Sequence, residues 1–255
     1  MRTTIAALAA ASALTCLAMS APAAAQDEGK RTYVYAYYFH CDAAKDSQAD
    51  DAVTKLYKPV YDAAVADGTI KSWAWAAHNA GGEWSRLGYH TGASLKAVIA
   101  AGDTLGTRTN TKTNKENAKQ EKSFNEACST HEDYIWASVA GKDVQGHRGN
   151  ATFSTYYVCD GSREKQADAL VKRVFAPMYD KMVADGKLVS WGWFEHMLGG
   201  KYRRLATMTA ANMDALLEAR VAIGKMLEND PLGEDFTGIC GSHQDYMWDI
   251  KVQAP

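Results

Sequence analysis

Apolar and polar residues follow each other in patterns that predict a strand and then a helix. The run from Tyr33 to His40 is rich in tyrosine, valine and phenylalanine, which favour strands. Between Ser47 and Asp67 apolar residues recur at helical spacing, and Gly68 supplies a C-terminal stop. Pro59 lies inside this pattern and predicts a kink or a break into two helices, because proline lacks the N–H that an interior helical turn uses.

The next segments predict a β-hairpin, a second helix and a closing strand. Two β-rich runs, Ile70–His78 and Trp84–His90, flank a turn at Gly81-Gly82. A second helix is expected to begin near Ala93, and a last strand to run from about Cys128 to Val139. The resulting order of elements is β-α-β-β-α-β.

The same pattern occurs twice. A shift of 118 residues, the separation of Cys41 and Cys159, aligns the two copies without a gap as far as about Ala97. Near the ends the shift is 112, the separation of Cys128 and Cys240, so the first copy carries a net six extra residues. We place them in the polar stretch 107–122 and predict repeats at 31–140 and 151–252, joined by a glycine-rich polar linker at 141–150. Matching segments include Cys41-Asp42 with Cys159-Asp160, Ser72-Trp73-Ala74-Trp75 with Ser190-Trp191-Gly192-Trp193, Gly81-Gly82 with Gly199-Gly200, and Arg86-Leu87 with Arg204-Leu205.

This order of elements is that of the ferredoxin-like, split βαβ unit. Two such units in one chain resemble the dimeric α/β-barrel superfamily with both halves fused. The resemblance implies an α+β fold, with tandem ferredoxin-like βαββαβ repeats packed sheet to sheet as a pseudo-dimeric α/β barrel. That superfamily includes cofactor-free monooxygenases, cyclases, isomerases, haem enzymes and stress proteins, so the fold leaves the function open.

The N-terminus predicts an export signal at residues 1–25. Arg2 is the only charge before Asp27, an apolar run follows it, and Ala23-Ala24-Ala25 is typical of a cleavage site. Removal of this segment takes Cys16 with it and leaves four cysteines, an even number that suits an oxidising compartment. The protein is therefore predicted to be periplasmic or secreted.

Composition narrows the range of partners. Of the 255 residues, 47% are hydrophobic and 23% charged, which is ordinary for a globular protein. The net charge of −2 and the lack of a basic stripe disfavour nucleic acid, and no long apolar segment beyond the signal predicts a membrane span. A small-molecule ligand is the expected partner, and the chain is expected to be a monomeric pseudo-dimer or a homo-oligomer.

The cysteines predict disulfides within this proposed topology. The first and last strands of a ferredoxin-like unit are antiparallel neighbours, so Cys41 is expected to bond to Cys128 and Cys159 to Cys240. A metal site is disfavoured, because no C-x-x-C or H-x-x-x-H spacing accompanies the cysteines.

If Cys41 faces Cys128 directly, Tyr38 lies opposite His131, with Asp133 on the same face. In the second repeat the corresponding residues are Tyr156, His243 and Asp245. A histidine held by a carboxylate and facing a phenol is a candidate catalytic acid or base. The competing interpretation is a structural hydrogen-bond network.

The hairpins supply a second candidate cluster for ligand binding. On the expected alternation, Trp73 and Trp75 share a face with Trp84 and Arg86, while Trp191 and Trp193 share one with Tyr202 and Arg204. An arginine among indoles can bind a carboxylate or phenolate, although such clusters also occur as ordinary cores. His40 is expected beside His131 and is added to the candidate binding residues.

Three functions remain open at this stage. The first is an exported small-molecule-binding barrel that acts, without a cofactor, as a lyase, isomerase, cyclase or monooxygenase on an aromatic or carbonyl compound. The second is a non-catalytic binding or stress protein with the same fold. The third is a haem-binding barrel, for which pocket-facing histidines exist but no haem motif does.

Overall fold

A computed structural model describes residues 31–142, 146–228 and 231–254, and the predicted export signal lies outside them. The first half comprises β1 (Tyr33–Cys41), η2 (Ala43–Lys45), α1 (Asp46–Ala52), η3 (Val53–Tyr57), α2 (Lys58–Ala66), β2 (Ser72–Gly81), β3 (Arg86–Gly92), α3 (Leu95–Arg108), α4 (Lys115–Ala127) and β4 (Cys128–Lys142). The second half comprises β5 (Ala151–Val158), α5 (Glu164–Leu170), η4 (Val171–Phe175), α6 (Ala176–Ala184), β6 (Ser190–Leu198), β7 (Arg204–Ala210), α7 (Met213–Leu227), α8 (Pro231–Thr237) and β8 (Ser242–Ala254).

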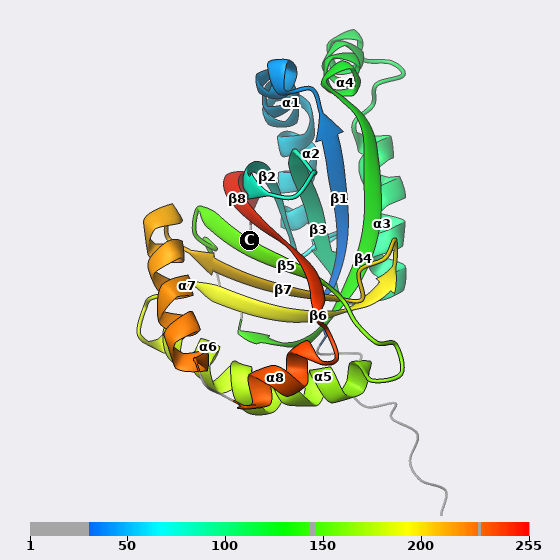
Figure 1. The fold of residues 1–255 in the computed structure, drawn as a ribbon. Helices are drawn as coiled ribbons and strands as arrows, with labels where there is room; N and C mark the ends of the chain where they lie inside the picture. Colours follow the sequence, from blue (N-terminus) through cyan, green and yellow to red (C-terminus); the bar gives the residue numbers. More distant parts are fainter. Residues whose placement is uncertain (1–30, 143–145, 229–230, 255) are drawn as a thin grey trace, which may run out of the picture.

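The strands close into one antiparallel barrel. Their order around it is β1-β3-β2-β8-β5-β7-β6-β4. Each half contributes four strands, and the halves join where β2 pairs with β8 and β4 with β6. The helices lie outside the barrel, those of the first half in one group and those of the second in another (Figure 1). The expected α+β barrel with external helices is confirmed.

The predicted break at Pro59 takes the form of a π-helical turn. This turn, η3, lies between α1 and α2, and Pro59 occupies the first turn of α2. The second half repeats the arrangement, with η4 directly before the helix that carries Pro177. A proline has no backbone N–H to donate to the preceding turn, so an α-helix would lack that hydrogen bond as well. The wider π-helical turn before the proline therefore loses no hydrogen bond that an α-helix would have kept.

Both predicted disulfides are present. Cys41 is bonded to Cys128 and Cys159 to Cys240, so each bond ties the end of a repeat's first strand to the start of its last strand. The sequence separations are 87 and 81 residues. In the loop-closure model, cross-links of this span each stabilise the fold by about 4 to 5 kcal/mol, because they restrict the unfolded chain.

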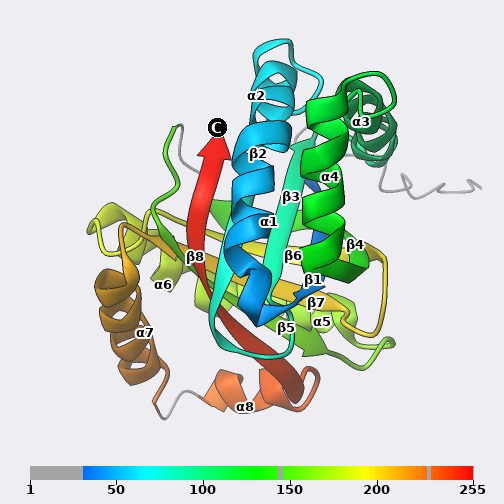
Figure 2. The same ribbon diagram turned by 90° about the horizontal axis from the view of Figure 1, so that it is seen from above.

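The polar stretch 107–122 contains the start of a helix that the pattern does not predict. Asn114 caps α4, since its side chain accepts hydrogen bonds from the backbone N–H groups of Glu116 and Asn117. α4 packs beside α1 (Figure 2). It has 13 residues and its counterpart α8 has seven, which accounts for the six-residue difference between the copies. None of the helices in the described ranges is long and apolar enough to cross a membrane.

Aromatic side chains close one end of the barrel interior. Two stacked pairs, Tyr134 with Trp136 and Tyr246 with Trp248, are related by the repeat. Trp84 lies in the β2–β3 connection, and its ring stacks on Tyr246 within this interior cluster. The prediction that Trp84 shares a face with the tryptophans of β2 is therefore wrong, and the same holds for Tyr202. Both residues follow the hairpin turns, where strict alternation along a strand no longer applies.

The paired glycines explain how the two halves meet. The turn at Gly81-Gly82 packs on Tyr246 of the second half, whose hydroxyl accepts a hydrogen bond from the backbone N–H of Glu83 at 2.9 Å. The turn at Gly199-Gly200 packs on Tyr134 of the first half in the same way. Each hairpin tip thus contacts a tyrosine of the opposite repeat, and only glycine leaves room for this approach.

Replacing Gly82 with alanine is expected to destabilise the protein by about 1–3 kcal/mol, because the new Cβ overlaps the hydroxyl of the buried Tyr246. Gly106→Ala is the control: nothing lies within 4 Å of the added Cβ in α3, so this change is expected to be neutral or to stabilise by up to about 1 kcal/mol. Urea unfolding at neutral pH measures both. Equal stabilities of the two variants would contradict this account of the turn.

Candidate functional site

The predicted pairing of Tyr38 with His131 is wrong by one residue. A β-bulge next to Cys41 shifts the β1–β4 register, so that His131 lies opposite Phe39 and Tyr38 lies opposite Glu132. Because side chains alternate between the faces of a strand, a shift of one residue moves each predicted partner to the other face. Tyr38 therefore points into the barrel, while His131 points outward.

The second repeat has the same shift. Tyr156 lies opposite Gln244, and His243 lies opposite Tyr157. Tyr156, like Tyr38, is fully buried in the barrel interior. Burial raises the pKa of both phenols well above the ordinary value, so both stay protonated and do not serve as bases.

The histidines keep their predicted carboxylate neighbours. Nε2 of His131 lies 3.4 Å from Oδ1 of Asp133, and Nε2 of His243 lies 3.9 Å from Oδ2 of Asp245. About half of each imidazole is exposed, so both pairs are open to solvent at the barrel's outer face. His40 was predicted to lie beside His131, but it does not. Its Nε2 instead lies 3.6 Å from Oε1 of Glu132 in β4.

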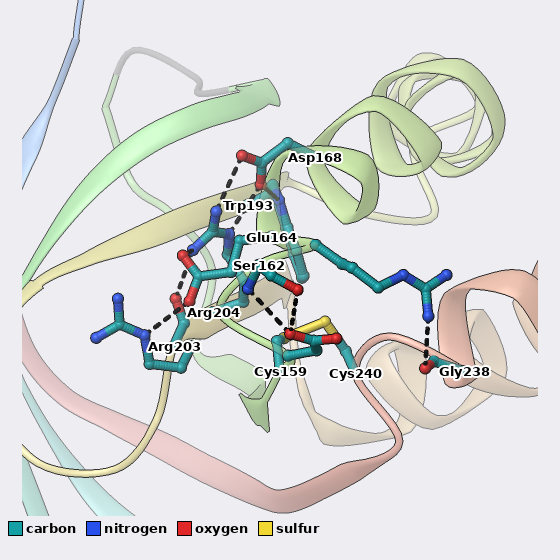
Figure 3. Close-up of a disulfide and its surroundings, with 11 residues drawn as sticks. Cys159, Ser162, Glu164, Asp168, Trp193, Arg203, Arg204, Gly238 and Cys240 are labelled. Atoms are coloured by element: carbon teal, nitrogen blue, oxygen red, sulfur yellow. Dashed lines mark hydrogen bonds and ion pairs between the residues drawn. A yellow bond between two sulfur atoms is a disulfide. The ribbon is translucent and has the colours of Figure 1, made fainter.

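The two hairpin arginines bind carboxylates of the protein itself. Nε and Nη2 of Arg86 donate to both oxygens of Asp50, at 2.9 and 3.0 Å. Arg204 donates in the same way to Asp168, at 2.8 and 3.0 Å, and also to Glu164 at 3.0 Å (Figure 3). Only about 1% of the Arg204 side chain is exposed. These guanidinium groups hold a helix to the sheet and are not available to a ligand.

Four tryptophans of the hairpins are fastened in a similar way. Each indole N–H donates to an aspartate of a covering helix: Trp73 to Asp62, Trp75 to Asp50, Trp191 to Asp180 and Trp193 to Asp168, at 2.7–2.9 Å. The geometry thus favours the competing interpretation, a core cluster, for Trp73 and Trp75. The second-half tryptophans, however, also face a cavity.

One cavity lies inside the barrel. Its volume is about 410 Å³, and it is bounded at the aromatic end by Tyr38, Tyr156, Trp136 and Trp248. Its walls carry hydroxyl groups and aliphatic side chains from both halves. His131, which was predicted to face Tyr38, is not among its lining residues, and neither is Arg86 from the second predicted cluster.

A second cavity, of about 820 Å³, lies between the outer face of the second-half sheet and its helices. His243, Glu234 and Thr237 are its exposed polar residues, and Arg220 from α7 is partly buried in it. Aromatic rings supply much of the remaining surface: Tyr157, Phe175, Tyr179, Trp191, Trp193 and Phe236. Of the predicted site residues, this cavity brings together His243, Trp191 and Trp193.

The first half fills the corresponding space differently. Tyr37 reaches under α3, where its hydroxyl lies 3.7 Å from the position of a Cβ on Gly102. Its hydroxyl also approaches Nδ1 of His90 at 3.5 Å, and that ring is fully buried. At the shift of 118 residues, Tyr37 becomes Thr155 and Gly102 becomes Arg220. The second copy therefore loses the tyrosine that occupies this space and gains a cationic side chain above it.

The electrostatics of the second cavity suit an electron-rich ligand. The guanidinium of Arg220 stacks on the ring of Phe153, 3.7 Å from its centroid, and forms no ion pair with the residues described. Burial raises the pKa of Tyr157 and Tyr179, so these phenols remain neutral donors. A cation, two phenols and an imidazole next to a carboxylate can bind and protonate an oxyanion.

Arg220 and the two tyrosines were missed by sequence reasoning. The sequence signal that could have found Arg220 lies beyond residue 97. When the alignment of the two copies is continued there, Gly102 of the first copy aligns with Arg220 of the second. The buried positions of the two helices support this alignment: Val98, Ala101 and Leu105 correspond to Leu216, Ala219 and Ile223.

Comparison with solved structures identifies proteins of the same fold. A candidate monooxygenase from Lactobacillus acidophilus has a TM-score of 0.58 at 10% identity, covering 88% of this chain and 96% of its own. An anthrone oxidase-like protein has a TM-score of 0.51 at 11% identity, covering 90% of this chain and 94% of its own. A candidate DyP-type peroxidase from Shewanella oneidensis has a TM-score of 0.55 at 8% identity, covering 88% of this chain and 94% of its own. No protein-family model and no curated protein matches the sequence. At these identities the similarity shows a shared fold, a closed antiparallel barrel with helices outside it, and nothing about the reaction.

Asp168 is expected to make the free energy of unfolding depend on pH in the acidic range. Burial alone would raise its pKa, but hydrogen bonds from Arg204 and Trp193 hold that pKa below its ordinary value of 3.8. The ionised Asp168 carboxylate therefore makes its full contribution to the free energy of unfolding above pH 3.8. This contribution is lost as the pH falls through the lower folded-state pKa. Asp168→Asn is expected to cost about 3–5 kcal/mol at pH 7 and to weaken the acid dependence, measured by urea unfolding from pH 7 to pH 3.

The control is Asp51→Asn, which removes an exposed pair with Lys55 and is expected to cost about 0.5 kcal/mol or less. Parallel stability curves for the wild type and Asp168→Asn below pH 5 would contradict the role given to this carboxylate.

Proposed function

We propose that this protein binds a small aromatic or carbonyl compound in the second-half cavity and performs acid/base chemistry on it without a cofactor. The observation that carries the proposal is the joint placement of His243, Arg220 and six aromatic rings on one cavity of about 820 Å³. Cavities of this size and lining are typical of small-molecule sites.

His243 is the proposed acid and base. Histidine is the side chain most often used as a catalytic acid or base, and the carboxylate of Asp245, 3.9 Å from Nε2 of His243, can hold the imidazole in one orientation. The imidazole removes a proton from the carbon next to a carbonyl, and the negative charge moves to the carbonyl oxygen. Arg220 stabilises that oxyanion, and His243 returns the proton at the same or a conjugated carbon. The step is an isomerisation that needs no oxidant.

The proposal confines this chemistry to the second half. His131 and Asp133 form the equivalent pair in the first half, but neither lines either of the two cavities described above. In the first half Tyr37 and His90 occupy the space that corresponds to the cavity. One repeat then serves as scaffold and the other as site, an outcome that duplication permits.

A haem group fits this cavity less well. His243 is the single histidine among its lining residues, and with about half of its side chain exposed it lies at the rim. A rim imidazole suits proton exchange with solvent better than axial ligation of a buried haem iron. A non-catalytic binding protein, by contrast, would use the same aromatic surface and Arg220, and the experiment below separates it from the enzyme.

The proposed setting of this site is an exported protein built from two ferredoxin-like units. Within each half the first strand lies between the last strand and the third in the ferredoxin-like manner, as in β4-β1-β3-β2, which supports assigning 31–140 and 151–252 as the two units. The two disulfides are compatible with an extracellular or periplasmic location and support the proposal that residues 1–25 are an export signal.

Deuterium exchange tests the chemistry on a panel of candidate substrates. The protein is incubated in D₂O with aryl ketones and 1,3-dicarbonyl compounds, and mass spectrometry measures deuterium uptake at the carbon next to the carbonyl. His243→Gln is expected to lower catalysed exchange by about 100-fold or more. Arg220→Met is expected to weaken binding of the same compound by about 10-fold or more, because a charge-assisted hydrogen bond is lost.

His131→Gln is the matched control, since it changes the equivalent histidine of the first half and is expected to leave exchange unchanged. Binding with no exchange in the wild type would favour the non-catalytic alternative. A Soret band on addition of haemin, abolished by His243→Gln, would favour haem instead. Equal loss of exchange in both histidine variants would refute the assignment to the second half.

A further inference from the structure

The aromatic end of the barrel interior contains two equivalent phenol–indole pairs that differ in their hydrogen bonding. In the first-half pair, Nε1 of Trp136 donates to the hydroxyl of Tyr38 at 3.3 Å. In the second-half pair, the hydroxyl of Tyr156 and Nε1 of Trp248 are both buried and have no hydrogen-bond partner among the described residues. Tyr38 and Ser154 are close enough to affect the pKa of Tyr156, but not in the geometry of a hydrogen bond.

Two unpaired polar groups from residues that line one cavity need an explanation. A buried donor or acceptor without a partner costs about 1–3 kcal/mol, and most buried polar groups in proteins are paired. Tyr156 and Trp248 both line the 410 Å³ cavity, so a group entering that cavity can reach them. A hydroxyl group fits both, because it accepts from the indole N–H and still has a proton and a lone pair for the phenol.

The wall of the cavity between this end and its mouth combines hydroxyl groups with apolar side chains. Leu87, Tyr89, Phe194, Leu205 and Ile250 line it from four strands of the barrel. A volume of about 410 Å³ lies in the range of small-ligand pockets. The apolar side chains of this wall can pack against an aromatic ring.

The mouth carries positive charge. Arg31, Lys142 and Arg148 line the cavity, and none of its lining residues is an aspartate or a glutamate. Arg31 is partly neutralised by Glu195, whereas the exposed Lys142 forms no ion pair with the residues described. A cationic rim around an apolar cavity favours a ligand with an anionic end.

We propose that the barrel interior is a second ligand site, which takes a small aromatic carboxylate with a hydroxyl group on the far side of its ring. The hydroxyl group pairs with Tyr156 and Trp248, the ring fills the apolar section, and the carboxylate lies at the mouth near Lys142. This site is separate from the second-half cavity, which lies on the other face of the same sheet. The two share only Trp191, Gly192 and Thr207 as lining residues.

Calorimetric binding of three probes to the full chain tests the proposal. The probes are 4-hydroxybenzoate, benzoate and 4-hydroxybenzyl alcohol. The wild type is expected to bind 4-hydroxybenzoate about tenfold more tightly than either of the others, because each lacks one of the two polar groups. Equal affinity for all three, or no binding, overturns the proposal.

Tyr156→Phe is expected to abolish the preference for 4-hydroxybenzoate over benzoate, while the matched variant Tyr38→Phe retains it. Lys142→Glu, at the exposed mouth, is expected to weaken carboxylate binding about threefold to tenfold and to leave the alcohol unaffected. Lys96→Glu on the outer surface of α3 is the charge control. The lysine variant keeps the test decisive if the interior variants fail to fold.

Arg220→Met separates this site from the one proposed above. It is expected to leave 4-hydroxybenzoate binding unchanged, since Arg220 lines only the second-half cavity of the two. Loss of probe binding in Arg220→Met but not in Lys142→Glu would place the probe in that cavity and refute the interior site. Failure of the deuterium-exchange experiment leaves the interior proposal unaffected.

Discussion

A buried arginine–aspartate pair in each repeat holds the first helix of that repeat to the outer face of the barrel. Arg86 with Asp50 and Arg204 with Asp168 form bidentate pairs from a hairpin strand to a helix. The same aspartates accept hydrogen bonds from the hairpin tryptophans. Removing one partner would leave an unpaired buried charge, which destabilises the protein far more than the intact pair stabilises it. The pair therefore holds the helix, the hairpin and the barrel together.

That rigid framework allows the two halves to differ in the space they enclose. The ion pairs, the disulfides and the glycine turns recur in both copies, so the backbone is held twice in the same way. Some of the side chains between sheet and helix, however, differ between the copies. Tyr37 and Gly102 are replaced by Thr155 and Arg220, and α8 is six residues shorter than α4. A duplicated scaffold of this kind can keep the space between sheet and helices filled in one half and leave a cavity there in the other.

The barrel interior is also filled at one end and open at the other along its axis. Stacked tyrosine and tryptophan pairs fill one end, and the glycine turns of both hairpins close over them. Hydroxyl and aliphatic groups surround an unfilled section at the other end. Trp136 is hydrogen-bonded to Tyr38, whereas the corresponding polar atoms of Trp248 and Tyr156 are buried without a partner among the described residues, so the same residue types are paired in one half and unpaired in the other.

The sequence by itself determined the order of elements, the duplication and the disulfides, because periodicity, repeat spacing and cysteine position are local or pairwise properties. Tertiary structure alone decided which predicted site residues meet. A single bulge beside Cys41 separated Tyr38 from His131, and a bulge is a backbone feature with no side-chain signature in the pattern. The cavities, one of which is lined by both Arg220 and His243, depend on side-chain volumes summed over several strands and helices, and no stretch of sequence contains that sum.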